Sequence, residues 1–128
     1  MEINLLKYLS NNDLIEIKLD VPQVGSKNIN FEDLIDNYLY DFIIDINGYV
    51  KFGHGHYKLN HKQKYLYFAG RTKIKNKQII YIDNDSGHYY PNKEQLEKLI
   101  LSIKQSNFIS NNIEYKFIDL DSFFIDLI

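Results

Sequence analysis

Histidine and arginine side chains, which can bind anions or move protons, concentrate in the middle of this chain. All of its histidines lie there, at His54, His56, His61 and His88. The sole arginine, Arg71, lies between the last two. Glycines flank His54 and precede His88, and glycine permits backbone conformations and close approaches that other residues resist. The stretch 54–91 is therefore the part of the chain most suited to chemistry.

The first hypothesis for this stretch is a binding pocket. Arginine presents a planar fork of donors to phosphate or carboxylate groups, and tyrosine adds a hydroxyl. We expect the ligand-binding residues to be His56, Arg71, Ser86, His88 and Tyr89. The alternative is that Arg71 is a surface arginine in an ion pair and that most tyrosines belong to the sheet and the core.

The second hypothesis is acid–base chemistry at His88. Histidine titrates near neutral pH and can exchange protons with a nearby hydroxyl, such as Ser86 or Tyr89, or with a substrate. Against this, a serine in a turn more often bonds the backbone, and no third residue that would orient His88 can be named. His88 is therefore a catalytic candidate only if the protein is an enzyme, which the sequence leaves uncertain.

A metal site is the third hypothesis. Imidazoles are common zinc ligands, and His88 could join His54, His56 and His61. Such spacing is unspecific, so we expect solvated loop histidines instead. We predict no metal and no other cofactor.

The composition limits the class of protein. The 128 residues, 45% of them hydrophobic, match one domain spanning residues 1–128 with its own core. A net charge of −2 gives no basic excess, so general nucleic-acid binding is not expected. The absence of cysteine makes the cytoplasm the default location. We expect neither export nor membrane insertion, since no signal pattern and no apolar run of membrane-spanning length is present.

Hydrophobic spacing in the first third of the chain predicts short elements. Leucines at helical spacing indicate a short helix over residues 3–9, and alternation over 15–19 is typical of a half-buried strand. A loop rich in Pro, Gly, Ser and Asn follows at 22–30, and a short helix is expected over 31–37.

Two hairpins are predicted in the middle of the chain. Aromatic and β-branched residues favour a strand over 38–46, with 49–52 as its partner. Asn47-Gly48 between them is typical of a type I′ turn, in which both central residues have positive φ. A second strand pair, 65–75 and 78–83, is linked by Asn76-Lys77.

One long helix and a last strand complete the prediction. Asn92 and Gln95 form a capping-box pattern, and helical apolar spacing continues from Lys93 to Ser106. Alternation over 113–117 predicts a strand, and we expect the apolar tail 123–128 to be buried within the monomer or across a dimer interface. The fold class is α+β: a largely antiparallel sheet of hairpins with the long helix packed on it.

The stretch from Ile44 to Leu96, under half of the chain, resembles a known domain. The motifs that carry the resemblance are Asp45-Ile46-Asn47-Gly48, His56, Ala69-Gly70 and Asn84-Asp85-Ser86-Gly87-His88-Tyr89-Tyr90-Pro91. The domain is shared by plant calmodulin-binding IQ-motif proteins and bacterial effector or toxin-like proteins. Its pattern has Ala-Gly opening a strand and Ser-Gly-His-Tyr-x-Pro before a helix. This chain has His56-Tyr57-Lys58 where the family has His-Ser-Ser, and it has no IQ motif, so calmodulin binding is not carried over.

The resemblance implies a shared fold with a site near His56 and His88, in proteins often used in conflict between organisms. We therefore expect a small binding module for a polar or anionic ligand, for example a nucleotide-like one, in a bacterial or viral conflict setting. Two alternatives stay open: an effector or toxin enzyme that uses a histidine acid–base, and an immunity-type protein that binds a protein partner. We expect a monomer or a homodimer.

Overall fold

The computed structural model describes residues 2–17, 28–61, 63–86 and 89–119, and it has the α+β fold that the sequence predicts. In these residues the strands are β1 (Ile15–Glu16), β2 (Tyr40–Ile44), β3 (Val50–Gly53), β4 (Tyr65–Leu66), β5 (Phe68–Lys75), β6 (Gln78–Asp83) and β7 (Ile109–Lys116). The α-helices are α1 (His56–Leu59) and α2 (Lys93–Ile103), and 3₁₀ turns lie at Leu6–Tyr8, Asn11–Asp13 and Phe31–Asp33.

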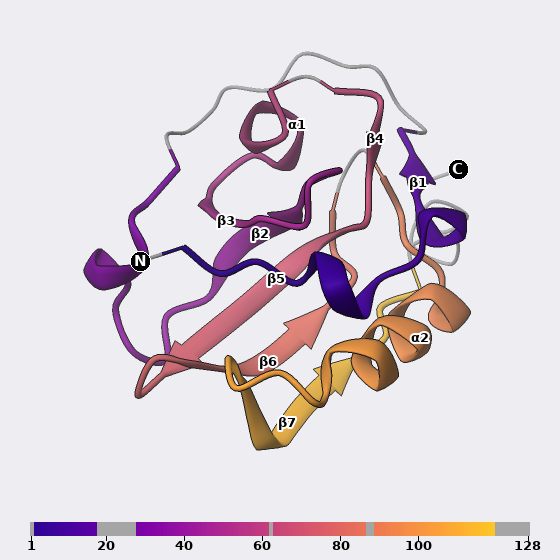
Figure 1. Ribbon diagram of the computed structural model, residues 1–128. Helices are drawn as coiled ribbons and strands as arrows, with labels where there is room; N and C mark the ends of the chain where they lie inside the picture. The colour runs from indigo at the N-terminus through magenta and orange to yellow at the C-terminus, as the bar shows by residue number, and fades with distance from the viewer. Residues whose placement is uncertain (1, 18–27, 62, 87–88, 120–128) are drawn as a thin grey trace.

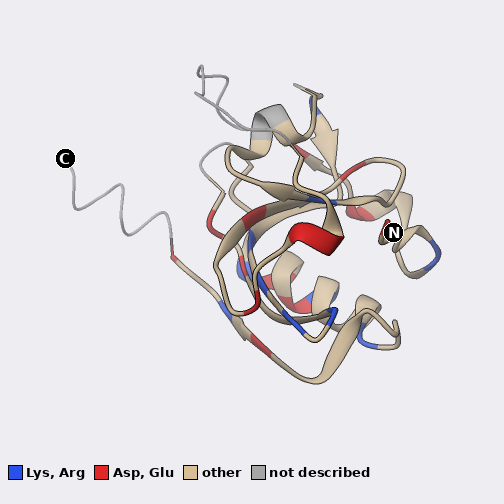
Figure 2. Cartoon of the chain, turned by 90° about the vertical axis from the view of Figure 1, so that its left-hand side faces the viewer, with Lys and Arg blue, Asp and Glu red and all other residues tan. Residues whose placement is uncertain are grey.

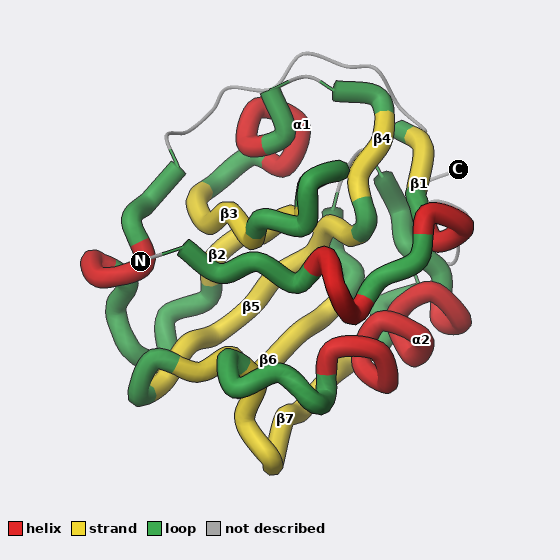
Figure 3. Tube along the Cα trace, viewed as in Figure 1, coloured by secondary structure: helices red, strands yellow, loops and turns green. Residues whose placement is uncertain are grey.

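A five-stranded sheet forms the centre of the molecule (Figure 1, Figure 3). Its strand order is β3-β2-β5-β6-β7, and neighbouring strands are antiparallel except for β6 and β7. Parallel strands need a long crossover, and the connection between β6 and β7 contains α2. A separate two-stranded sheet joins β1 to β4. The central sheet is therefore largely antiparallel, as predicted.

The first predicted hairpin is present as β2 and β3, but the prediction of a type I′ turn is wrong. Gly48 has a φ of 85°, whereas Asn47 does not have positive φ. Gly48 N–H donates to the carbonyl of Asp45 at 2.9 Å, and the Asp45 carboxylate accepts from the N–H groups of Asn47 and Tyr49. The loop is therefore a three-residue one that ends in a left-handed glycine and is held by an aspartate side chain.

The second predicted strand pair contains the type I′ turn instead. Asn76 and Lys77 have positive φ values of 51° and 62°. The prediction of one continuous strand over 65–75 is wrong, because the chain changes sheets at Tyr67. Residues 65–66 form β4 and pair with β1, and β5 begins at Phe68.

The long helix α2 begins as predicted. Asn92 Oδ1 accepts from Gln95 N–H and Gln95 Oε1 accepts from Asn92 N–H, each at 2.8 Å, which completes the capping box. The side chains that the helix buries are Leu96, Leu99, Ile100 and Ile103. The helix ends at Ile103 rather than Ser106, because the chain turns there and Ser106 N–H donates to the Ile103 carbonyl.

The helix predicted over 3–9 is wrong, since only residues 6–8 form a single 3₁₀ turn. Val50 N–H donates to the Ile3 carbonyl and Leu5 N–H to the Gly48 carbonyl, so the residues before the turn run beside β3 and its turn. Tertiary pairing overrides helical spacing here. The helix expected over 31–37 is likewise a 3₁₀ turn, Phe31–Asp33, and it ends there because the backbone of Leu34 is extended.

The last strand, β7, is longer than the predicted 113–117 and parallel to its neighbour. Among the predicted segments, three lie wholly or partly outside the described residues: the end of the strand at 15–19, most of the loop at 22–30 and the buried tail at 123–128. None of the helices in the described part of the chain has the length and apolarity needed to cross a membrane. Basic and acidic residues are interspersed over the chain rather than segregated (Figure 2).

Candidate functional site

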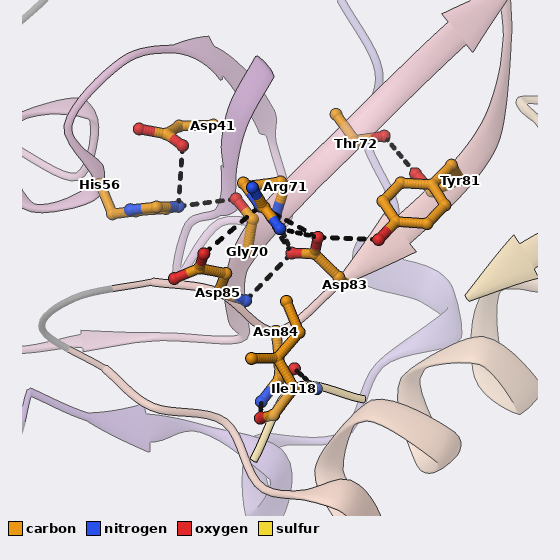
Figure 4. Close-up of polar contacts among 10 residues, drawn as sticks. All are labelled: Asp41, His56, Gly70, Arg71, Thr72, Tyr81, Asp83, Asn84, Asp85 and Ile118. Carbon is orange, nitrogen blue, oxygen red and sulfur yellow. Dashed lines mark hydrogen bonds and ion pairs between the residues drawn. The ribbon is translucent and has the colours of Figure 1, made fainter. Parts of the chain in front are cut away.

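A dense polar cluster surrounds the carboxylate of Asp83, at the end of β6 (Figure 4). Asp83 is fully buried. Its Oδ2 lies 2.8 Å from Nη2 and 3.0 Å from Nε of Arg71, and it accepts a hydrogen bond of 2.9 Å from the Tyr81 hydroxyl. Oδ1 accepts from the backbone N–H groups of Arg71 and Asp85. Both oxygens of this buried carboxylate are therefore satisfied, which is the condition for burying a charge.

The register of the sheet aligns the charged groups. Arg71 on β5 lies opposite Asp83 on β6 and opposite Asp41 on β2. Residues paired across neighbouring strands point to the same face, so these three side chains form a row of alternating charge. Asp85, just past the end of β6, brings Oδ2 to 3.6 Å from the Arg71 Nε.

The protonation states of the cluster follow from its contacts. Partial burial lowers the pKa of Arg71, but the hydrogen bond and the negative charge of Asp83 outweigh it, so the pKa is raised. Burial raises the pKa of Tyr81 to about 12, and the hydrogen bond to Asp83 and its charge act in the same direction. At neutral pH, Arg71 is a cation and Tyr81 is a hydroxyl donor.

His56 reaches the same row from α1, of which it is the first residue. Gly55 N–H donates to Asp41 Oδ2 at 2.8 Å, which ties this end of α1 to β2. The buried His56 ring has Nε2 at 2.6 Å from the Gly70 carbonyl and 3.7 Å from Asp41 Oδ1. A carbonyl only accepts, so Nε2 carries the proton. Burial lowers the pKa of His56 despite the opposing charge of Asp41, and the ring is neutral with Nδ1 unprotonated.

Ser86 and Tyr89 are buried, and their hydroxyls bond within the protein. Ser86 Oγ accepts from Tyr90 N–H at 3.2 Å, which is the local turn contact expected of a serine. Tyr89 Oη donates to the Gln63 carbonyl at 3.0 Å and accepts from Asn60 Nδ2 at 3.2 Å. These bonds hold Tyr89, at the end of the Ser-Gly-His-Tyr motif, against Asn60 and Gln63.

The structure therefore brings two of the predicted ligand-binding residues, His56 and Arg71, into one cluster. His88, the catalytic candidate, lies outside the described residues. Three members of the cluster were not predicted from the sequence: Asp41, Asp83 and Asp85. A signal was present for Asp41, because it interrupts a run of apolar strand residues, where a charge needs a partner. Asp83 gave a weaker signal, since it ends an apolar run and is followed by polar residues.

The expectation of solvated loop histidines is wrong for His56, which is buried and begins α1. His54 and His61 are exposed. The ring of His54 lies 6.3 Å from the rings of both Tyr38 and Tyr40. Within residues 2–17, 28–61, 63–86 and 89–119, no three His, Asp or Glu side chains gather as ligands for a metal ion.

A pocket of about 250 Å³ lies at a different place, between residues 9–14 and α2. Its lining includes Leu9, Tyr67 and the ion pair of Lys98 with Asp13, whose Nζ and Oδ1 lie 2.7 Å apart. None of the predicted site residues lines it. This pocket is therefore separate from the polar cluster on the sheet.

Fold and cluster together define an α+β protein with a row of charged side chains across its sheet. No family model, no curated protein and no solved structure matches the chain. The family resemblance suggested by the Ser-Gly-His-Tyr-x-Pro motif stays a prediction.

Proposed function

We propose that this protein is a binding module that holds a small polar ligand at the Arg71 end of the charged row. One observation carries the proposal: the Arg71 guanidinium is fixed by the buried Asp83 and yet remains 30% exposed. A side chain held in place before binding loses little conformational freedom when a ligand arrives. Arg71 therefore offers a preorganised set of donors at the surface.

The free hydrogen-bonding groups indicate the class of ligand. Asp83 takes the Nε–H and one Nη2–H of Arg71, which leaves the other guanidinium N–H groups for a ligand acceptor. Asp41 and Asp85 lie on either side, with side chains 25% and 42% exposed, and they can accept from a ligand donor. The ligand should therefore present a hydrogen-bond acceptor and a donor side by side.

The charges of the cluster further restrict the class of ligand. Arg71 is the one cation beside three carboxylates in this cluster of described residues, and His56 is neutral. A purely anionic ligand would gain from Arg71 but would be repelled by Asp41 and Asp85. The edge of a nucleobase carries adjacent donors and acceptors, so it fits this arrangement better than a phosphate group does. This favours the nucleotide-like form of the expected ligand, bound through its base.

Ligand-observed NMR with the four ribonucleosides, their 5′-monophosphates and inorganic phosphate tests the proposal. We expect at least one nucleoside to bind and phosphate alone not to bind. Asp85→Asn should weaken binding about 10- to 100-fold, the usual value of a hydrogen bond to a charged group. Asp36→Asn, an exposed aspartate before β2, is the matched control and should bind as the wild type does.

Two outcomes would contradict the proposal: binding of phosphate with no nucleoside binding, and equal affinities for Asp85→Asn and the control.

Mass spectrometry of the recovered ligand separates a binding module from the second candidate, an acid–base enzyme. That candidate is favoured by the unprotonated Nδ1 of His56, for which the described residues provide no hydrogen-bond partner. A converted ligand, with conversion abolished in His56→Gln, would replace the binding module by the enzyme.

A further inference from the structure

β7 is an outer strand of the central sheet, and one of its edges has no described partner. It pairs with β6 on one side, and no described strand pairs with the other (Figure 1). The opposite outer strand, β3, is covered, because Val50 N–H donates to the Ile3 carbonyl and Ile29 N–H to the Phe52 carbonyl. A row of unpaired backbone N–H and C=O groups is a template for another strand.

The hydrogen bonds at the end of β7 indicate which backbone groups point outward. The N–H and the C=O of Ile118 both bond to the side chain of Asn84, at 2.7 and 2.9 Å, so both point toward β6. Backbone groups alternate in direction along an extended strand. The register with β6 shifts before Glu114 and is regular from Glu114 to Lys116, so the backbone groups of Tyr115 and Phe117 point away from β6 and toward the open edge.

This edge is complementary to itself in the antiparallel direction. When Tyr115 of two copies lie opposite each other, Glu114 of each copy lies opposite Lys116 of the other, and Ile113 lies opposite Phe117. Glu114 and Lys116 are exposed, and Tyr115 is 49% exposed. Opposite charges and apolar pairs directly across antiparallel strands stabilise the pairing.

We propose that β7 pairs antiparallel with β7 of a second copy of this chain, around a two-fold axis at Tyr115. The pairing joins two five-stranded sheets into one continuous sheet and gives partners to the outward backbone groups. A two-fold contact of a surface with itself is closed, so the product is a dimer and not a fibre. This interface is independent of the ligand proposed above.

Charge reversal tests the register of the pairing by sedimentation equilibrium over a concentration series. Glu114→Lys and Lys116→Glu each replace two attractive cross-strand pairs by two repulsive ones, and each should raise the dimer Kd about 10- to 30-fold. The double variant restores attraction with the signs exchanged and should dimerise like the wild type. Glu97→Lys on the exposed side of α2 is the matched control and should leave the Kd unchanged.

Disulfide trapping provides a second measurement, because the chain has no cysteine of its own. Two Tyr115→Cys residues at the axis would have Cα atoms about 5.5 Å apart, within disulfide range. Mild oxidation should yield a covalent dimer, whereas Leu101→Cys, 73% exposed on α2, should stay monomeric. A monomeric wild type at every concentration, or a dimer that neither charge reversal weakens, would overturn the proposal.

Discussion

At the scale of single residues, Asp83 is the side chain that holds the polar cluster together. It is fully buried and bonds to Arg71, Tyr81 and the backbone of Asp85. Without it, Arg71 loses its fixed position and Tyr81 loses its acceptor. The cluster therefore contributes to stability as well as to the proposed binding surface.

Asp83→Ala should destabilise the fold by about 2 to 4 kcal/mol in urea unfolding. Removal of one partner from a buried ion pair costs about 3 to 5 kcal/mol, and the part-exposed Arg71 can regain some hydration. Asp36→Ala, an exposed aspartate, should change the free energy of unfolding by no more than about 0.5 kcal/mol. Equal effects of the two substitutions would show that the Asp83 contacts do not stabilise the protein.

His56 should make the free energy of unfolding depend on pH. Burial holds the folded pKa of His56 below its ordinary value of 6.5, which the unfolded chain retains. Below that ordinary value the unfolded state binds a proton that the folded state does not, so stability is present above it and is lost as the pH falls. The urea midpoint of the wild type should therefore decrease from neutral to mildly acidic pH.

The matched pair for this measurement is His56→Gln and His61→Gln. Glutamine at position 56 can still donate to the Gly70 carbonyl but does not titrate, so the dependence on pH should flatten. His61 is exposed, and its substitution should leave the wild-type dependence in place. A steep acid loss that persists in His56→Gln would assign the effect to another group.

At the scale of elements, the close contact between β5 and β6 depends on Gly70. A Cβ atom built at Gly70 would overlap the backbone carbonyl oxygen of Asp83, which has no flexible side chain to move aside. Gly70→Ala should therefore force the strands apart and destabilise the protein by about 3 kcal/mol in urea unfolding. Lys75→Ala, on the exposed end of the same strand, should be nearly neutral. A Gly70→Ala variant as stable as the wild type would contradict the close approach of β5 and β6 at Gly70.

Local signals predicted the elements whose partners are close in the sequence. The capping box placed the start of α2, and turn residues placed the hairpins of β2 with β3 and of β5 with β6. Distant partners decided the rest. Residues 3–9 are not helical because they run beside β3, and the strand at 65–75 is divided because β4 pairs with β1. Nothing in the spacing of 109–116 indicates parallel pairing with β6.

For the whole molecule, the candidate site was predictable only in part. His56 and Arg71 could be found because their residue types are rare in this chain and suited to binding. Their partners could not be assigned from the sequence. Asp41 interrupts an apolar run, but only the register of β2, β5 and β6 shows that Asp41 and Asp83 lie opposite Arg71. Strand pairing decides which aspartates lie in the site, and a single sequence does not reveal that pairing.

The parallel pairing of β6 with β7 has a consequence for synthesis on the ribosome. Both hairpins can form as soon as they leave the exit tunnel, since each closes over a short turn. One edge of β6 stays unpaired until α2 and β7 have been translated, because its partner β7 follows the whole crossover in the sequence. During that interval the nascent chain exposes the backbone edge that includes Ile79 and Ile82, and an exposed strand edge is a template for pairing with another chain.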